Sequence, residues 1–420
     1  MPYMLTTNES QSIEVGTSLP FGHGCSAGTA QACSGLQELV PAYRKRCPLD
    51  DDIPYLLLTP GPLTTSRTVR EAMLSDLSTW DVDYNSIVNQ VRDSIVDLAT
   101  DRDGYTCTLM QGSGTFGVEA AIGSVLPEDG KLLVITNGAY GQRIGAITAR
   151  LGIDHVTLEH GETDLPDLGR VAATLSEDAR ISHVAMAHCE TTTGILNPAE
   201  QVGKLCTDFG KRFILDAMSS FGGIPMKMES VGADFLISSA NKCIQGVPGF
   251  AFVVAAQSSM KQIEGRARSV SLDLFDQWRE MESGHGKWRF TSPTHVLCAF
   301  AQALKELKEE GGVQARHARY CENHRRLVSG MQDLGFRTLL PDETQSPIIT
   351  SFLYPDDPRF DFRVFYDKIK ARRFVLYPGK VSNAECFRIG TIGHVFPDDI
   401  SELLGCVDEV SEEMAIRLPT

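Results

Sequence analysis

Residues 105–118, YTCTLMQGSGTFGV, carry the pattern that decides the fold. Seven residues rich in apolar and β-branched side chains predict a strand over 105–111, and a helix is expected to open at Ser113. The glycines between the two elements permit a tight turn. A strand that leads through a glycine-rich turn into a helix is a building unit of α/β proteins.

The same alternation continues to residue 256. Short apolar runs predict further strands at 131–137, 181–189, 211–218, 233–240 and 250–256. Amphipathic patterns at 140–152 and 198–210 predict helices between them. Runs of this kind are typical of a mostly parallel sheet that helices cover on both faces. The expected fold class is α/β, with the ligand beyond the carboxyl ends of the strands.

From residue 295 onward the pattern changes to longer helices. Apolar residues recur at helical spacing over 297–307 and again over 320–334. Further strands are expected at 349–355, 374–379 and 386–393, with helices over 362–373 and 398–414. These elements predict a smaller α+β domain.

The chain therefore divides into three predicted parts. A large domain spans 53–305 and a small C-terminal domain spans 306–420. Residues 1–52 are rich in Ser, Gly, Thr and Ala and have no sustained periodicity, which predicts a poorly ordered N-terminal extension. A role of this extension in oligomer contacts is the alternative.

Composition narrows the function class. The chain has 420 residues, 42% of them hydrophobic, and a net charge of −15, which disfavours nucleic acid or an anionic membrane as partner. Its eleven cysteines form no CxxC pair and its histidines form no HxxxH or HxH pair, so neither a disulfide frame nor a metal site is expected. The N-terminus does not resemble a secretory signal, and the expected location is the cytoplasm.

The turn Ser113-Gly114-Thr115 is a candidate anion site. Glycine lets the backbone approach an anion, and a helix N-terminus offers free N–H groups with a favourable dipole. The two hydroxyl groups would add donors. An ordinary turn that caps a helix is the alternative, because the sequence is neither a Walker loop nor a GxGxxG motif.

Asp216 and Lys242 each follow a buried strand. Asp216 ends an apolar run, where a carboxylate needs a cation or hydrogen-bond donors; it suits a protonated ring nitrogen, or else it caps the next turn. Burial should lower the pKa of Lys242 toward that of a usable amine, which is what a lysine that forms a Schiff base with a carbonyl requires. A surface lysine that reaches solvent is the alternative.

Arg388 lies between apolar residues in a predicted strand of the small domain. Its guanidinium offers two prongs for carboxylate or phosphonate oxygens, and a structural salt bridge is the alternative. Together the four features predict a cradle for a phosphate, a carboxylate for a pyridinium, a lysine for an aldehyde and an arginine for an anionic substrate. No Gly-x-Ser-x-Gly is present, so a serine-hydrolase site is not expected.

Eight phrases of the chain run in order from about 55 to 395: TPGPLTTSRTV, NGAYGQR, ETTTGILNP, DAMSSFGGIPM, SSANKCIQGVPGFAFV, HGKWRFTSPTH, LYPGKVS and CFRIGTIG. With these phrases the chain resembles the class V aminotransferases of fold type I, which use pyridoxal 5′-phosphate. Within that group it is similar to the 2-aminoethylphosphonate–pyruvate aminotransferases. The resemblance covers the chain except its first fifty-odd residues.

The resemblance implies roles for the cofactor-binding and catalytic residues. It implies that Lys242 binds the cofactor aldehyde and that Asp216 pairs with the ring nitrogen. Ser113, Gly114 and Thr115 would hold the phosphate, and Tyr140 would stack on the ring.

Three further residues take roles from the same resemblance. Thr193 would approach the ring hydroxyl or the lysine side, and Arg388 would bind the substrate anion. Thr291 would reach the phosphate of a neighbouring subunit, which implies a homodimer. Whether Lys287 or Arg289 contacts the substrate stays open.

The expected activity is transfer of the amino group of 2-aminoethylphosphonate to pyruvate. The products would be phosphonoacetaldehyde and L-alanine. An alanine– or serine–glyoxylate aminotransferase and a lyase acting on an aminophosphonate are the alternatives. Cysteine desulfurase is disfavoured, because its relatives place a histidine before the lysine and Asn241 stands there.

Overall fold

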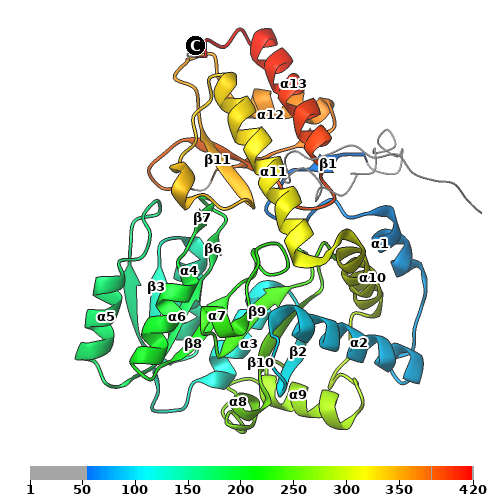
Figure 1. Ribbon diagram of the computed structural model, residues 1–420, viewed down its shortest axis with the longest axis vertical. Helices are drawn as coiled ribbons and strands as arrows, with labels where there is room; N and C mark the ends of the chain where they lie inside the picture. Colours follow the sequence, from blue (N-terminus) through cyan, green and yellow to red (C-terminus); the bar gives the residue numbers. More distant parts are fainter. Residues whose placement is uncertain (1–53, 380, 419–420) are drawn as a thin grey trace, which may run out of the picture. The chain divides into compact units, whose positions relative to one another are not determined.

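Seven strands form one sheet in the computed structural model, which describes residues 54–379 and 381–418 (Figure 1). The strands are β2 (Tyr105–Gln111), β3 (Lys131–Thr136), β4 (Asp154–Glu159), β5 (Ile181–Ala187), β8 (Arg212–Asp216), β9 (Phe235–Ser239) and β10 (Phe250–Ala256). Their order across the sheet is β2-β10-β9-β8-β5-β3-β4. Strand β10 is antiparallel to both of its neighbours, whereas the pairs from β9 to β4 are parallel. The mostly parallel sheet expected from the sequence is confirmed.

Helices cover both faces of this sheet. One face carries α2 (Val82–Ala99), α5 (Leu168–Glu177), α6 (Ala199–Asp208), α7 (Met228–Val231) and α10 (Thr294–Glu310). The other carries α3 (Gly114–Val125), α4 (Ala139–Arg150), α8 (Gln257–Lys261) and α9 (Leu274–Ser283). The expected α/β class, a sheet between two helical layers, follows from this arrangement.

The strands supply apolar side chains to both layers in alternation. On β3, Leu133 and Ile135 join the core under α5 and α6, whereas Leu132 and Val134 join the core under α3 and α4. Successive side chains of a strand point to opposite faces, so a strand buried on both faces must be apolar throughout. Each such side chain contributes about 1.5–3 kcal/mol to the free energy of unfolding.

A second, three-stranded sheet is formed near the C-terminus, in the order β11-β14-β13. Its strands are β11 (Ile349–Leu353), β13 (Tyr377–Pro378) and β14 (Cys386–Gly390), and its helices are α11 (Gly312–Asp333), α12 (Phe362–Ala371) and α13 (Pro397–Glu413). They enclose a core of their own, in which Phe387 and Phe352 stack at 5.8 Å between ring centroids.

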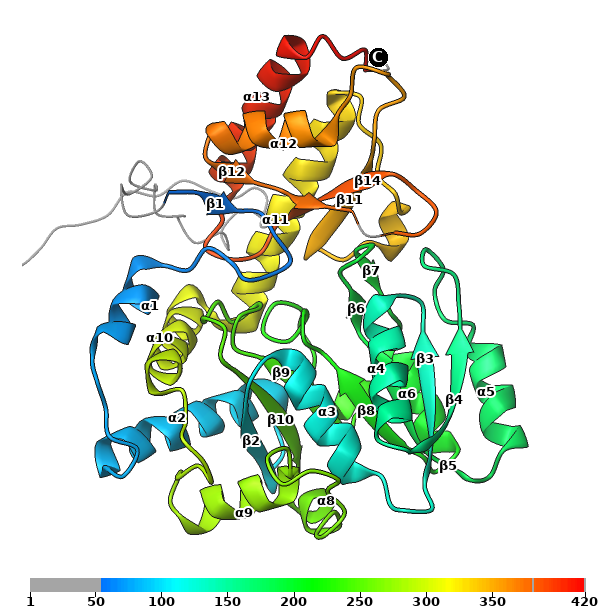
Figure 2. The ribbon, with the colours of Figure 1, turned by 180° about the vertical axis from the view of Figure 1, so that it is seen from behind.

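The first described strand belongs to this C-terminal part. Strand β1 (Leu56–Leu57) pairs in parallel with β12 (Phe374–Val375), as Figure 2 shows from behind. The chain then passes through α1 (Arg67–Glu71) before it reaches α2. This path brings residues 58–62 from one sheet toward the other.

Several elements were not expected from the sequence: β4, α2, α5, α9 and the small hairpin of β6 (Cys189–Glu190) and β7 (Ile195–Leu196). Strand β4 is half exposed at the edge of the sheet, so it lacks the apolar run that marks its neighbours. Residue 305, the predicted domain boundary, lies within α10, and the described residues form one compact unit. The division at 305 stays a prediction.

The predicted N-terminal extension, residues 1–52, lies outside the described residues. Within the part of the chain that the structure describes, none of the helices combines the length and the apolarity that crossing a bilayer requires.

Candidate active site

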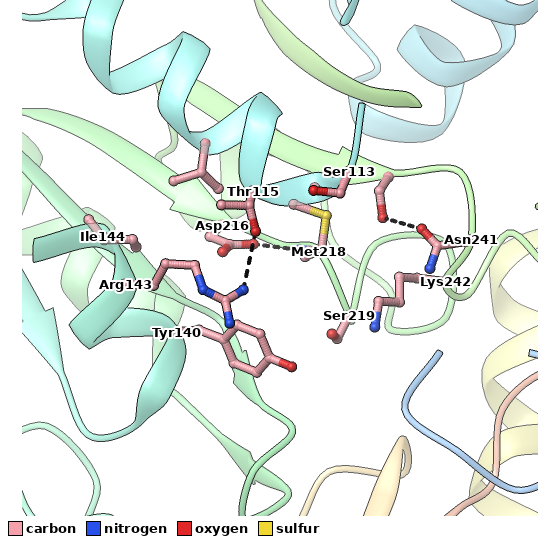
Figure 3. Close-up of a pocket in the computed structure, with 13 residues that line it drawn as sticks. Ser113, Thr115, Tyr140, Arg143, Ile144, Asp216, Met218, Ser219, Asn241 and Lys242 are labelled. Carbon is pink, nitrogen blue, oxygen red and sulfur yellow. Dashed lines mark hydrogen bonds between the residues drawn. The ribbon is translucent and has the colours of Figure 1, made fainter. Parts of the chain in front are cut away.

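A cavity of about 180 Å³ lies at the carboxyl ends of β8 and β9, against the N-terminus of α3 and one side of α4. The residues that line it are Ser113, Gly114, Thr115, Val118, Tyr140, Arg143, Ile144, Asp216, Met218, Ser219, Ser239, Asn241 and Lys242. In Figure 3, Asp216, Arg143 and Tyr140 lie on one side of the cavity and Lys242 lies on the other. These side chains therefore meet beyond the carboxyl ends of the strands, where the ligand was expected.

The turn before α3 forms one wall. Gly112 has φ +116°, a conformation that favours glycine, and Ser113 is the N-cap residue of α3. The Ser113 side chain makes no capping hydrogen bond, so its hydroxyl and the first N–H groups of the helix are open to a ligand. An anion bound at this wall would be stabilised by the helix dipole.

Asp216 is the last residue of β8 and is almost fully buried. Its Oδ1 accepts a hydrogen bond of 2.9 Å from the Met218 N–H, and none of the ion pairs found among the described residues includes it. Burial raises its pKa to about 6. A buried carboxylate with so few partners is ready to bind a cation or a proton.

Lys242 follows β9 in the loop 240–249. Its Nζ donates a hydrogen bond of 2.5 Å to the Pro60 carbonyl, and burial lowers the pKa of its amine. Gly61 packs beside it: a Cβ there would stand 2.9 Å from Nζ, and φ is +119°. The segment 58–62 therefore encloses the lysine, and a side chain at position 61 would displace it.

Helix α4 contributes Tyr140 and Arg143. Arg143 Nη1 donates to Thr115 Oγ1 at 3.2 Å, and its guanidinium lies 5.1 Å from the centre of the Tyr140 ring. The Tyr140 hydroxyl accepts a 3.0 Å bond from Thr191 Oγ1. The ring is therefore held at its edge by a hydroxyl and on one face by a cation.

Glu190 holds the N-terminus of α4. Its carboxylate accepts hydrogen bonds from the N–H groups of Tyr140 at 3.1 Å and Gly141 at 2.8 Å. Glu190 is fully buried, and this burial raises its pKa to about 7. An anion at the N-terminus of a helix is stabilised by the helix dipole, so Glu190 fixes the turn that carries Tyr140.

Arg388 lies in the middle of β14 and does not itself line the cavity. Nε and Nη2 donate to the Pro378 carbonyl at 3.0 and 2.8 Å, and Nη1 donates to the Thr191 carbonyl at 2.6 Å. Burial lowers the pKa of the guanidinium, whose central carbon lies over the Tyr377 ring, 4.9 Å from the ring centre. Thr191 also donates a hydrogen bond to Tyr140, which lines the cavity, so Arg388 lies directly behind the cavity wall. Its three hydrogen bonds leave two of the five N–H groups of the guanidinium for a ligand.

Two predicted residues lie elsewhere. Thr193 is buried in the turn 190–194, where its Oγ1 contacts the Glu190 carbonyl at 3.3 Å, and it does not line the cavity. Thr291 is exposed in the loop between α9 and α10. The roles implied for them, including contact with a neighbouring subunit, stay predictions.

Lys287 and Arg289, whose contact with the substrate stays an open question, have partners of their own. Lys287 Nζ lies over the Trp80 ring at 5.1 Å, and Arg289 pairs with Asp276 at 3.4 Å. Neither residue lines the cavity, so both are engaged outside it.

Several lining residues were missed from the sequence, above all Arg143, Met218 and Asn241. Arg143 stands one helical turn after Tyr140 in the NGAYGQR phrase, and this spacing was the available signal. Met218 and Asn241 belong to loops after β8 and β9, and their direction depends on the path of each loop.

The cavity fits pyridoxal phosphate. The free N-terminus of α3 suits a phosphate, the under-bonded Asp216 suits a protonated ring nitrogen, and the buried amine of Lys242 suits an aldehyde. Tyr140 offers an aromatic face at the same wall. Each part of the cofactor therefore has a matching group among the described residues.

Comparison with known proteins agrees with this fit. The model of the aminotransferase class-V family matches residues 66–359. A 2-aminoethylphosphonate–pyruvate transaminase of Syntrophobacter fumaroxidans is 62% identical over 351 residues, covering 84% of this chain and 95% of the relative. The protein of the same name from Klebsiella pneumoniae is 58% identical over 355 residues, covering 84% and 97%.

Solved structures match the fold. A ureidoglycine–glyoxylate aminotransferase from Bacillus subtilis has a TM-score of 0.81 at 22% identity, covering 90% of this chain and 96% of its own. A pyridoxamine–pyruvate aminotransferase from Mesorhizobium loti has a TM-score of 0.80 at 22% identity, covering 87% and 94%. These likenesses concern the fold, whereas the family model covers most of the sequence. The chain belongs to the class V aminotransferase family.

Proposed function

We propose that this protein transfers the amino group of 2-aminoethylphosphonate to pyruvate, giving phosphonoacetaldehyde and L-alanine. The observation that carries the proposal is one buried cavity holding both Lys242 and Asp216, in a chain 62% identical to a transaminase of that name. As a class V aminotransferase it uses pyridoxal phosphate. A cytoplasmic location and a homodimer, both expected from the sequence, are part of the proposal.

Bound pyridoxal phosphate supplies an aldehyde that takes up the amino group and a ring that withdraws electrons from the neighbouring carbon. Ser113, Gly114 and Thr115 hold its phosphate at the N-terminus of α3, and Tyr140 packs on its ring. Asp216 holds the proton on the ring nitrogen. Pairing with that cation repays the cost of keeping its carboxylate buried.

Lys242 moves the proton. Burial lowers the pKa of its amine, so Nζ is available in the neutral form to accept the proton from the carbon that bears the substrate nitrogen. The same Nζ would then donate this proton again, so that one amine serves first as base and then as acid. The second half of the cycle uses the same group in the reverse direction, with pyruvate as acceptor.

Arg388 binds the anionic end of the substrate, with Thr193 and the Thr291 of a second subunit in the roles that the resemblance implies. The guanidinium is anchored on the Pro378 and Thr191 carbonyls, which leaves the outer N–H groups for phosphonate or carboxylate oxygens. A planar fork serves both anions in turn, whereas a lysine would fix their orientation less well.

An amine-donor screen tests the proposal. Purified protein loaded with pyridoxal phosphate is given 2-aminoethylphosphonate with pyruvate, and alanine is measured. Serine or alanine with glyoxylate forms the parallel arm, in which glycine is measured. The third arm contains 2-aminoethylphosphonate without a keto acid, and ammonia is measured. Alanine formation in the first arm alone supports the proposal. Turnover confined to the glyoxylate arm, or ammonia release in the third, replaces it with one of the alternatives.

A further inference from the structure

One face of α11 carries four polar side chains that are almost fully buried. They are Arg316, Arg319, Tyr320 and Asn323, each exposed by 2% or less. Their spacing of three and four residues places them on a single face of the helix. Burying polar groups costs free energy unless each finds a partner, so the partners of this face are informative.

Two of these side chains hold the loop that carries Lys242. Arg316 Nη1 donates to the Cys243 carbonyl at 2.6 Å, and the Tyr320 hydroxyl donates to the same oxygen at 3.2 Å. Gln245 Nε2 donates to the Tyr320 hydroxyl at 2.7 Å. The accepting oxygen belongs to the residue directly after Lys242. The backbone from which the lysine side chain leaves is thus fixed by α11.

The same face holds the segment that follows β14, the strand of Arg388. Arg319 Nη1 donates to the carbonyls of Gly393 at 2.9 Å and Val395 at 2.6 Å. Gln245 Nε2 also donates to the Gly393 carbonyl, at 2.7 Å. One carbonyl therefore receives a bond from α11 and another from the loop of Lys242, which ties the two segments together.

Glu310 at the end of α10 supplies the negative charge. Its carboxylate accepts bonds from Arg316 Nε at 2.6 Å and from Arg319 Nε at 2.8 Å. Burial alone would raise the pKa of Glu310, but the two guanidinium groups outweigh it and hold the pKa below its usual value. Each of the two guanidinium groups bonds the Glu310 carboxylate on one side and a backbone carbonyl on the other. Such charged hydrogen bonds define the geometry of the cluster well.

We propose that Arg316 is a positioning residue for Lys242, and that α11 sets the placement of the Lys242 loop relative to the strand of Arg388. Arg316 reaches Lys242 only through the Cys243 carbonyl, so it acts on the direction of the lysine and not on the substrate. The inference rests on the role proposed above for Lys242, and not on the identity of the amine donor.

The backbone of the Lys242 loop adopts a conformation that contacts outside the loop must hold in place. Gln245 has φ +68°, a backbone conformation that residues other than glycine rarely adopt. Such residues persist where surrounding bonds over-determine them, and they gather at functional sites. The bonds that Gln245 makes to Tyr320 and Gly393 are the ones that α11 organises.

Arg316→Lys tests the proposal, with Arg92→Lys as matched control. A lysine keeps the charge beside Glu310 but cannot reach Glu310 and the Cys243 carbonyl with one planar fork. Arg92 is also buried, pairs with Glu282 and donates to the Cys107 carbonyl at 2.7 Å, at the far end of β2. The two variants should lose similar stability, which thermal unfolding measures.

The first readout is the titration of Lys242 in the full-length protein freed of cofactor, by competitive acylation and mass spectrometry. A loosened loop lets the amine approach water, so its labelling midpoint should move to higher pH in Arg316→Lys and stay at the wild-type value in Arg92→Lys. This readout needs no substrate. An unchanged labelling midpoint would therefore count against the role of Arg316 alone. The assignment of 2-aminoethylphosphonate would be overturned by a different result, a wild-type protein that is inactive with this amine.

The second readout is the single-turnover rate with 2-aminoethylphosphonate, followed by the absorbance of the bound cofactor. For Arg316→Lys we expect a fall on the order of tenfold to a hundredfold in the limiting rate, with the half-saturating substrate concentration changed little. Tyr320→Phe removes one hydroxyl without a charge and should give a smaller fall of the same kind. Equal changes in Arg316→Lys and Arg92→Lys, or no change in either readout, would overturn the proposal.

Discussion

Glu310, which is half-buried, and Asp216, which is almost fully buried, are two carboxylates that behave in opposite ways. Glu310 accepts hydrogen bonds from Arg316 and Arg319, which outweigh its burial and hold its pKa below the usual value. Asp216 accepts one bond, from Met218, and burial raises its pKa to about 6. The junction of α10 and α11 thus stabilises its charge within the protein, whereas the cavity leaves its charge for a ligand to stabilise.

The cations of the two regions differ in the same way. Arg316 is buried with a carboxylate beside it, whereas burial lowers the pKa of Lys242, whose Nζ bonds one carbonyl. Paired charges favour a fixed structure, and unpaired ones favour chemistry at neutral pH. Four substitutions test this contrast: two in the cavity, one at the junction of α10 and α11, and one farther along α11.

Lys242→Ala should have the largest effect. Without the amine no group takes the substrate proton, so turnover should fall by about 10⁴-fold or more. Alanine formation measures the loss, and the free energy of unfolding should stay near that of the wild type. Lys204→Ala, at an exposed lysine paired with Asp208, serves as control and should keep full turnover. Substantial turnover in Lys242→Ala would remove the lysine from the mechanism.

Glu310→Gln should have the largest effect on stability. It leaves two arginines, each 2% exposed, without their carboxylate, and an unpaired buried charge costs about 3–5 kcal/mol. Urea unfolding followed by circular dichroism measures the loss. A change below about 1 kcal/mol would show that the cluster is not a stabilised set of charges, and the contrast with the cavity would disappear.

The pH dependence of stability should separate the two carboxylates by sign. In the cofactor-free protein, Asp216 has a pKa raised from 3.8 to about 6, so the stability that its neutral form allows is present below pH 4 and lost as pH rises to 6. The change is roughly 3 kcal/mol. Asp216→Asn should flatten this slope in urea unfolding at pH 4 to 6.

Glu310 should contribute the opposite slope. Because its pKa is lowered, its contribution is present above the unfolded value and is lost as pH falls through the folded one. Glu190, with its pKa raised to about 7, should extend the fall seen with Asp216 to that pH. If Asp216→Asn keeps the wild-type slope between pH 4 and 6, the burial of this carboxylate has been misjudged.

Glu322→Gln should have the smallest effect. Glu322 pairs with Arg325 and Arg326 at 2.8 and 2.6 Å, and the side chains of these two arginines are 67% and 36% exposed. Such pairs contribute about 0–1 kcal/mol, because water screens them. The same unfolding assay measures it. A loss as large as that of Glu310→Gln would mean that the burial of Arg316 and Arg319 is not what distinguishes the α10–α11 cluster.

The sequence was enough to predict six of the seven strands of the sheet and six of the thirteen residues that line the cavity. Apolar runs marked the strands buried on both faces. Ser113, Asp216 and Lys242 line the cavity as their places after strands suggested, and Tyr140 lines it as the resemblance implied. Parallel strands deliver their carboxyl ends to one edge, so a residue just after a strand is placed by topology alone.

What was missed depends on geometry that periodicity does not encode. The direction of β10 was not predicted, since an apolar run is the same in either direction. The charges of α11 suggest a solvated face, although Arg316 and Arg319 are buried by α10 and the loop after β14. Arg143 shares a helix face with Tyr140, and their spacing places it in the cavity only once the orientation of α4 is known.

The antiparallel strand β10 also bears on how the chain is made. Among the described strands, edge strand β2 pairs with β10 alone, with Gln111 opposite Phe250 and Tyr105 opposite Ala256. At typical synthesis rates the ribosome needs roughly 7–30 s to add the roughly 140 residues that separate these partners. During that interval β2 leaves the exit tunnel with unpaired N–H and C=O groups along an apolar strand. The nascent chain is therefore most open to chaperones, and to mispairing with its neighbours on a polysome, until residue 256 emerges.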